Sequence, residues 1–226
     1  MYKIETHLHT KPVSNCAYYE PEEMIRFYKK AGYNTVFVSD HLAKYHFDKL
    51  GEDLSWEQKV DLLYDSYLRA QAEGEKLEIT VLFSPELTLQ ENHYLLYHVT
   101  PEFIKSHEDL FTMTLEEFYH CAKANQITII QAHPYRDGKC TPQPAYVDGF
   151  EVINSHPRHE NFDEKVFALI KEHPGLASAG SDAHRMEDVA GAAVLSPYEI
   201  KTTDEYLALL RSGRAKLMKH GEIINI

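Results

Sequence analysis

The stretch Lys3-Ile4-Glu5-Thr6-His7-Leu8-His9-Thr10 joins a strand-like run to two histidines spaced two residues apart. Side chains two apart on a β-strand point the same way and lie about 6.5 Å apart, so these two imidazoles can share one metal ion. Other strand-like runs finish in a similar way, at Asp40-His41, at His133 and at Asp182-Ala183-His184. Metal-binding side chains at four strand ends predict one polynuclear metal site at the mouth of a barrel.

Strand-like and helix-like segments alternate along the chain. The expected strands cover residues 3–9, 35–39, 79–86, 94–99, 128–132, 150–154, 176–181 and 215–219. The expected helices cover residues 21–31, 55–73, 114–125, 162–172 and 203–212. Ser55 and Gly74 are the expected caps of the second helix, and residues 44–53 are expected to form a loop over the site.

This alternation predicts an α/β fold with parallel strands joined by right-handed crossovers. Polar ligands at the carboxyl ends of nearly all strands favour a barrel over a doubly wound sheet. The length of 226 residues fits one large domain, and we expect a single domain over residues 1–226.

The composition limits the classes of function. The net charge is −12 with histidine neutral, and no basic run is present, so nucleic acid is an unlikely partner and a small substrate is favoured. No apolar run is long enough to span a membrane, and the N-terminus lacks the apolar region of a signal peptide, so a cytoplasmic protein is expected. Three widely spaced cysteines indicate neither a disulfide framework nor a CxxC zinc site.

Nine side chains are candidate metal ligands. They are His7, His9, His41, Glu86, His93, His133, His156, Asp182 and His184. Glu86 ends an apolar run, and a carboxylate can bridge two cations, which imidazole cannot. Asp40 and His41 are adjacent, so both can face the site only if the strand has ended there. The other seven histidines are expected to be surface or hydrogen-bonded residues: His46, His98, His107, His120, His159, His173 and His220.

With these residues identified, the sequence resembles the PHP family (polymerase and histidinol phosphatase). The matching motifs are HxHT at residues 7–10, SDH at 39–41, AHP at 132–134, SDAH at 181–184 and GxEVxN at 149–154, with Glu86, His93 and Gly191 at the expected places. The resemblance implies a distorted (β/α)7 barrel with two or three divalent metals.

Under this resemblance, each ligand is assigned to one of three metals. His7, His9, Glu86 and Asp182 hold the first, Glu86, His93 and His133 the second, and His41 and His184 the third. Family members commonly carry Asp or His a few residues after HxHT, where this chain has Asn15. The third site is therefore the one in doubt, and water, Cys16 or His156 are the alternatives to Asn15.

The leading hypothesis is metal-dependent hydrolysis of a small phosphomonoester, such as a sugar phosphate, a nucleotide or a compound like histidinol phosphate. A metal-bound hydroxide attacks phosphorus in this hypothesis, and the proton for the leaving group comes from a water on the third metal, from His184, or from Asp40 acting through His41. Lys11, Arg136, Arg158 and Arg185 are the candidate phosphate-binding cations.

Two alternatives stay open, an exonuclease or phosphodiesterase that trims DNA or RNA ends and a non-catalytic, metal-stabilised binding module. Histidine and carboxylate ligands suit Mn, Fe and Zn alike, so the sequence does not identify the metal. It does not indicate an oligomeric state either.

Overall fold

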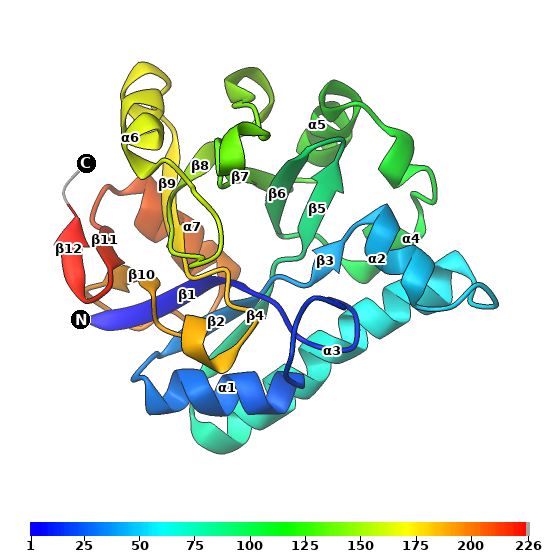
Figure 1. Ribbon diagram of the computed structural model, residues 1–226, viewed down its shortest axis with the longest axis horizontal. Helices are drawn as coiled ribbons and strands as arrows, with labels where there is room; N and C mark the ends of the chain where they lie inside the picture. The colour runs from blue at the N-terminus through cyan, green and yellow to red at the C-terminus, as the bar shows by residue number, and fades with distance from the viewer. Residues whose placement is uncertain (225–226) are drawn as a thin grey trace.

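The computed structural model describes residues 1–224 as a mixed α/β fold with two six-stranded sheets (Figure 1). The first sheet has the order β12-β11-β10-β1-β2-β4 and consists of β1 (Tyr2–Leu8), β2 (Thr35–Val38), β4 (Thr80–Phe83), β10 (Ala192–Ser196), β11 (Lys216–Lys219) and β12 (Glu222–Ile224). The second has the order β3-β5-β6-β7-β8-β9 and consists of β3 (His41–Leu42), β5 (Glu86–Leu89), β6 (Asn92–Tyr97), β7 (Thr128–Ala132), β8 (Gly149–Asn154) and β9 (Leu176–Gly180).

The helices lie around the outside of these sheets (Figure 1). They are α1 (Pro21–Lys30), α2 (Lys44–Lys49), α3 (Trp56–Leu77), α4 (Pro101–Lys105), α5 (Leu115–Ala124), α6 (Asp163–Glu172) and α7 (Thr203–Arg211). α1 packs along α3, which contacts β4, while α6 packs on β8 and α5 on β7. Among residues 1–224, no helix combines the length and the apolar character that crossing a membrane requires.

The strand directions are only partly those expected from the sequence. β1–β2, β2–β4, β3–β5, β7–β8 and β8–β9 pair in parallel, as expected for crossover connections. β5–β6, β6–β7, β1–β10, β10–β11 and β11–β12 are antiparallel, which corrects the all-parallel expectation. For β5 and β6 the reason is a tight turn after Leu89 with Gln90 at φ 54°, which reverses the chain before Asn92.

The two sheets meet where β2 and β4 end. The Ser84 amide donates to Val38 O at 3.1 Å and the Glu86 amide to Asp40 O at 3.2 Å, so the pairing of β2 with β4 passes into that of β3 with β5. A single parallel bridge between Leu8 and Ala183 joins the end of β1 to the segment after β9. Within residues 1–224 the sheet ladders do not close, so the (β/α)7 barrel stays a prediction.

Several element boundaries differ from the sequence expectation. Residues 44–53 contain the helix α2 rather than only a loop, and α3 continues past Gly74 to Leu77. Glu86 begins β5 instead of ending the preceding strand, because Pro85 interrupts the run. β10 and β12 were not expected, and the last two residues of the predicted domain, 225 and 226, lie outside the described residues.

The expected helix starts are confirmed at two capping boxes. The Ser55 hydroxyl accepts a hydrogen bond from the Gln58 amide, and the Thr114 hydroxyl accepts one from the Glu117 amide. Each cap satisfies an amide that the first helical turn would leave unpaired. These local signals explain why α3 and α5 begin where the sequence indicates.

The buried core lies on both sides of the strands that carry the site. One apolar cluster includes Ile4, Phe37, Leu95, Val152 and Val194, which come from strands of both sheets. These side chains are 0% exposed, so the strand ends project from a packed base. Such a base holds the polar side chains at the strand ends in fixed positions.

We predict that Gly74→Ala destabilises the protein even though Gly74 lies inside α3. A Cβ at this position would lie 2.6 Å from Val81 Cγ2 and 2.7 Å from the Ile79 carbonyl oxygen. Overpacking of this kind costs about 1–3 kcal/mol, which exceeds the gain of about 1 kcal/mol in helix propensity. Urea unfolding measures the change.

Ala72→Gly is the control, because Ala72 is an exposed residue of the same helix. Its free energy of unfolding should fall by only the difference in helix propensity between alanine and glycine, about 1 kcal/mol. An increase in the free energy of unfolding for Gly74→Ala would contradict the close approach of α3 to β4.

Candidate metal centre

Side chains from β1, β5 and the segment after β9 converge in a buried centre. His7 Nε2 lies 3.2 Å from Glu86 Oε1 and 3.6 Å from Asp182 Oδ1. His9 Nε2 lies 3.2 Å from Asp182 Oδ1 and 3.7 Å from Glu86 Oε2. All four side chains are at most 1% exposed. The structure thus brings together the four residues expected to hold the first metal.

Glu86 also faces the residues expected at the second metal. His133 Nε2 lies 3.1 Å from Glu86 Oε1, and His93 Nδ1 lies 3.6 Å from the same oxygen. Glu86, His93 and His133 can place one ligand atom each within 4.8 Å of one another. Glu86 therefore stands between two groups of histidines, as a bridging carboxylate would.

The centre contains buried polar atoms that lack hydrogen-bond partners among the described residues. They include His7 Nε2, His9 Nε2, His133 Nδ1 and Asp182 Oδ1. A buried polar atom without a partner costs about 1–3 kcal/mol. Several such atoms of metal-binding type in one buried cluster fit divalent cations held by nitrogen and oxygen donors.

Glu151 fixes the orientation of His7. Its Oε1 accepts a hydrogen bond from His7 Nδ1 at 2.9 Å, and its Oε2 accepts from the His133 amide at 3.1 Å and Asn154 Nδ2 at 2.8 Å. A histidine whose Nδ1 is held by a carboxylate presents Nε2 as the ligand atom. In the sequence, Glu151 stands within the GxEVxN motif, which by itself predicts no role for this residue.

Glu5 is a second buried carboxylate that the sequence analysis missed. Its Oε1 accepts hydrogen bonds from the amides of Thr6, His7 and Ser181, each at 2.9 Å, and its Oε2 accepts one from the Tyr28 hydroxyl at 2.8 Å. Burial raises the pKa of Glu5 to about 7 despite these bonds. Glu5 thereby ties β1 to the segment that carries Asp182. An acidic residue facing inward from an apolar strand was the available signal.

Asp40 is positioned differently from a catalytic acid. Its carboxylate accepts hydrogen bonds from the Thr10 amide and the hydroxyls of Thr10, Ser14 and Ser66, at 2.5, 2.6, 2.7 and 2.9 Å. Ser14 Oγ also lies 3.3 Å from His9 Nδ1. These contacts anchor the segment after His9, so the structure favours a positioning role for Asp40 over the expected catalytic one.

The backbone is strained at two expected ligands. His133 has φ 28° and Asp182 has φ 51°, values that non-glycine residues rarely adopt. Such conformations concentrate at functional sites, where the surrounding structure enforces them. Next to Asp182, a Cβ on Gly180 would lie 2.5 Å from His7 Cβ, so only glycine allows β9 to approach β1 this closely.

The electrostatics favour ionised carboxylates. Burial opposes charge on Glu86 and Asp182, but His7 and other cationic neighbours hold the pKa of each carboxyl well below its usual value. Burial, with His41 and His184 nearby, holds the pKa of His9 well below its usual value. Burial opposes protonation of His7 as well, yet Asp182, Glu151 and Glu86 raise its pKa well above the usual value. The carboxylates thus favour positive charge at this place, which a bound cation would supply in place of a proton on His7.

His41 and His184 lie at the outer side of the centre with two neighbours that extend the predicted set. His41 Nδ1 lies 2.7 Å from Glu86 Oε2, and Cys16 Sγ lies 3.3 Å from His41 Nε2. The His46 ring stacks on His41 with centroids 4.1 Å apart. His46 was expected to be a surface or hydrogen-bonded histidine; its Nδ1 accepts a hydrogen bond from the Asn15 amide, and α2 packs the ring against the site.

Three of the four expected phosphate-binding cations line an open cavity of about 590 Å³ beside the centre. Arg136, Arg158 and Arg185 line it together with His93, His156 and His184. Arg136 pairs with Asp182, Arg158 makes a two-point pair with Asp188 at 2.8 and 2.6 Å, and the Arg185 guanidinium stacks 4.2 Å above the Tyr18 ring. Lys11 is exposed and is not part of this lining.

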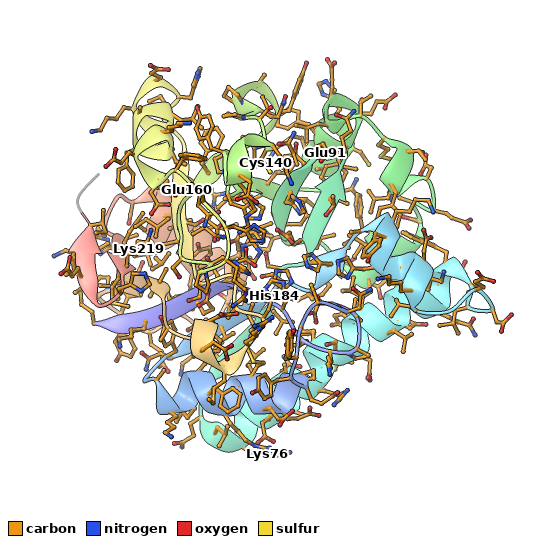
Figure 2. The ribbon with its side chains drawn as sticks, viewed as in Figure 1. Lys76, Glu91, Cys140, Glu160, His184 and Lys219 are labelled. Atoms are coloured by element: carbon orange, nitrogen blue, oxygen red, sulfur yellow. The ribbon has the colours of Figure 1, made fainter. Side chains whose placement is uncertain are left out.

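His156 lies beside the outer histidines. Its ring is 5.3 Å from that of His184, and its Nδ1 accepts a hydrogen bond from the Arg158 amide at 3.2 Å. Figure 2 shows His184 near the middle of the molecule, where side chains from both sheets gather. The geometry thus brings His156 to the cavity wall, while its expected role as a ligand stays a prediction.

Comparisons with known proteins bear on the fold. Residues 159–215 match the family model described as PHP-associated. No curated protein sequence gives a significant match. The chain is similar to a two-domain protein from Bacteroides vulgatus that contains a predicted PHP-like metal-dependent phosphoesterase, with a TM-score of 0.69 and 15% identity over 99% of this chain and 66% of the other.

Two further solved structures share the fold. The lesion-specific endonuclease PfuEndoQ from Pyrococcus furiosus gives a TM-score of 0.62 and 16% identity over 96% of this chain and 57% of the endonuclease. An amidohydrolase from Chromobacterium violaceum, solved with sulfate and no metal, gives 0.59 and 15% over 96% and 97%.

The PHP-associated match over residues 159–215 and the fold shared with a predicted PHP-like phosphoesterase agree with the resemblance of the motifs to the PHP family.

We predict that Glu151→Gln weakens metal binding by about 10- to 100-fold, the usual effect of losing a carboxylate that orients a ligating histidine. The carboxylate of Glu151 now accepts three hydrogen bonds. In the variant, the NH2 group of the glutamine side chain would face at least one of these donors and could not accept from it. Titration with a divalent cation against a competing chelator measures the affinity. Glu172→Gln, an exposed change on α6, is the matched control and should have no effect. Equal affinities for the two variants would contradict the role of Glu151.

Proposed function

We propose that this chain hydrolyses a small phosphomonoester with the help of divalent metal ions. The observation that carries the proposal is the buried Glu86 carboxylate, which faces histidines on two sides and lies beside a cavity lined by arginines. His7, His9, Glu86 and Asp182 would hold one ion, and Glu86, His93 and His133 a second. Divalent ions in such a centre lower the pKa of water and neutralise charge on phosphoryl oxygens.

The residues of the chain itself would bind and orient the phosphate. Arg185 and Arg158 stand at the cavity wall, where guanidinium groups can form two-point hydrogen bonds to phosphate oxygens. Arg136 is 15% exposed and is held by Asp182, so it would act at the inner end of the cavity. The volume of about 590 Å³ lies within the range of small-molecule sites.

His184 is the residue we propose as proton donor to the leaving group while no ion occupies its Nε2. Its Nδ1 lies 2.9 Å from the Asp182 carbonyl oxygen, which assigns the proton to that nitrogen and leaves Nε2 for other partners. The ring borders the cavity. His41 lies further in, against Glu86, and Asp40 would act only by anchoring the segment around His9.

Two finer features are part of this proposal. The ions would be Mn, Fe or Zn, two or three in number, since the inner donors are imidazoles and carboxylates. The sheets would correspond to the distorted (β/α)7 barrel of the family, with the Leu8–Ala183 bridge and the β2–β4 to β3–β5 transition as its junctions.

A nuclease is the second candidate, supported by the fold shared with a lesion-specific endonuclease. Strand binding would require a cationic groove, and the net charge of −12 does not favour one. Glu91 and Asp137 add acidic groups to the cavity lining. The small phosphomonoester therefore remains the preferred substrate class.

We predict that Asp182→Asn reduces phosphate release from p-nitrophenyl phosphate to background, because the variant loses a charged donor of the centre. Metal-loaded protein and a metal-free sample should be compared, with circular dichroism as the test of folding. Asp204→Asn, which changes a carboxylate that is 87% exposed, is the control and should retain activity. Undiminished release by metal-free protein would contradict the proposal, and release from oligonucleotides alone would favour the nuclease.

Arg185→Met should raise KM for a phosphomonoester about tenfold or more, with kcat less affected, because a charge-assisted hydrogen bond contributes about 1.5–3 kcal/mol. Steady-state kinetics on the metal-loaded enzyme separates the two constants. Arg211→Met, at the exposed end of α7, is the matched control. An unchanged KM would exclude Arg185 from phosphate binding.

A further inference from the structure

We propose that Cys16 supplies a thiolate ligand to the outer metal site, together with His41 and His184, so that this site selects a thiophilic cation such as zinc. The inference rests on the proposed metal centre but concerns a ligand that the family pattern does not provide. Asn15, the residue in line with the family pattern, is exposed, and its backbone amide donates to His46 Nδ1 at 3.3 Å. Cys16 is the neighbour that reaches the histidines.

The distance between Cys16 and His41 is close to that expected for two ligands of the same metal ion. Cys16 Sγ lies 3.3 Å from His41 Nε2. In a tetrahedral zinc site, with Zn–S near 2.3 Å and Zn–N near 2.0–2.1 Å, a sulfur and a nitrogen ligand lie about 3.5 Å apart. Since the Nδ1 side of His41 faces Glu86 Oε2 at 2.7 Å, Nε2 is the nitrogen available to an outer cation.

His184 completes a set of three donors. Its Nδ1 is occupied by the Asp182 carbonyl oxygen at 2.9 Å, so Nε2 is the free ligand atom. The Tyr18 amide donates to the His184 carbonyl oxygen at 3.0 Å, which holds the segment of Cys16 against His184. Cys16 is therefore in contact with His41 and is held by the backbone beside His184.

His9, whose Nε2 faces the inner donors Asp182 and Glu86, also borders the outer site. It is 0% exposed, and its Nε2 has no hydrogen-bond partner among residues 1–224. Its ring stacks on His41 with centroids 4.0 Å apart and lies tilted 4.3 Å from the His184 ring, and these three histidines can place ligand atoms within 4.8 Å of one another. A buried donor without a partner thus adjoins the proposed site.

His46 supports the site from outside rather than as a ligand. It can approach Cys16 and His41 closely enough to be a ligand. However, its Nδ1 accepts the Asn15 amide, which assigns the ring proton to Nε2. The stack of His46 on His41 at 4.1 Å instead fixes the plane of the His41 ring.

The donor types predict different metals at the two ends of the centre. A thiolate with two imidazoles favours zinc or cobalt over the harder magnesium and manganese ions. The inner donors include the carboxylates of Glu86 and Asp182, which suit manganese as well. The outer site should therefore retain zinc under conditions in which inner ions exchange.

Cobalt binding tests the thiolate directly. The wild-type protein, titrated with Co²⁺, should develop the near-ultraviolet charge-transfer absorption of a thiolate bound to cobalt, and Cys16→Ser should lose this absorption and about one equivalent of bound metal. Cys121→Ser is the matched control, because Cys121 Sγ makes a single contact with His107 Nε2 at 3.2 Å. Persistence of the absorption in Cys16→Ser, or its loss in Cys121→Ser, would overturn the proposal.

A second measurement needs no variant. Zinc should slow alkylation of Cys16 in the wild-type protein at least tenfold, measured by peptide mass spectrometry, with Cys121 as the internal reference. Equal alkylation rates with and without zinc would overturn the proposal. Neither readout depends on phosphate release, so a failed phosphatase assay and a failed thiolate site give different results.

Discussion

The burial of Glu86 is the constraint on which the site depends. A carboxylate at 1% exposure keeps its charge only where positive charge compensates the lost hydration. Nitrogen atoms of His7, His41 and His133 lie within 3.2 Å of its oxygens. Each of these imidazoles compensates the carboxylate charge only when it is protonated, and burial disfavours the protonated form. Divalent cations would supply the same charge without protonating the ligands, which is why the cluster is more easily explained with metal than without it.

Three other buried carboxylates show how the protein treats acids that do not face a cation. Glu5, Asp40 and Glu151 are at most 1% exposed, and each accepts three or more hydrogen bonds from amides, hydroxyls or imidazole. Their bonds hold the segments that carry the candidate ligands. In contrast, Glu86 faces imidazole nitrogens, and Asp182 Oδ1 has no hydrogen-bond partner among the described residues. The distinction between satisfied and unsatisfied carboxylates separates positioning residues from ligands.

The sequence predicted the candidate ligands better than their supports. His7, His9, His133, Asp182 and His184 follow strands whose apolar pattern is local, so their convergence could be anticipated. The role of Glu5 depends on Ser181, which is 176 positions away, and the role of His46 depends on a short helix that local signals did not indicate. The antiparallel β6 and the position of Glu86 at the start of β5 depend on a turn and on Pro85, which periodicity alone does not resolve.

The pairing of the cavity arginines bears on which phosphate esters would bind. Arg136 and Arg158 already hold Asp182 and Asp188, so an incoming anion gains less from them than from an unpaired guanidinium. A phosphomonoester carries nearly two charges and can compete for these groups, whereas each phosphate of a diester carries one. A nucleic-acid strand would also bring further phosphates past Glu91 and Asp137, where like charges repel. Under the proposed function, charge at a single terminal phosphate would therefore be the feature that this cavity selects.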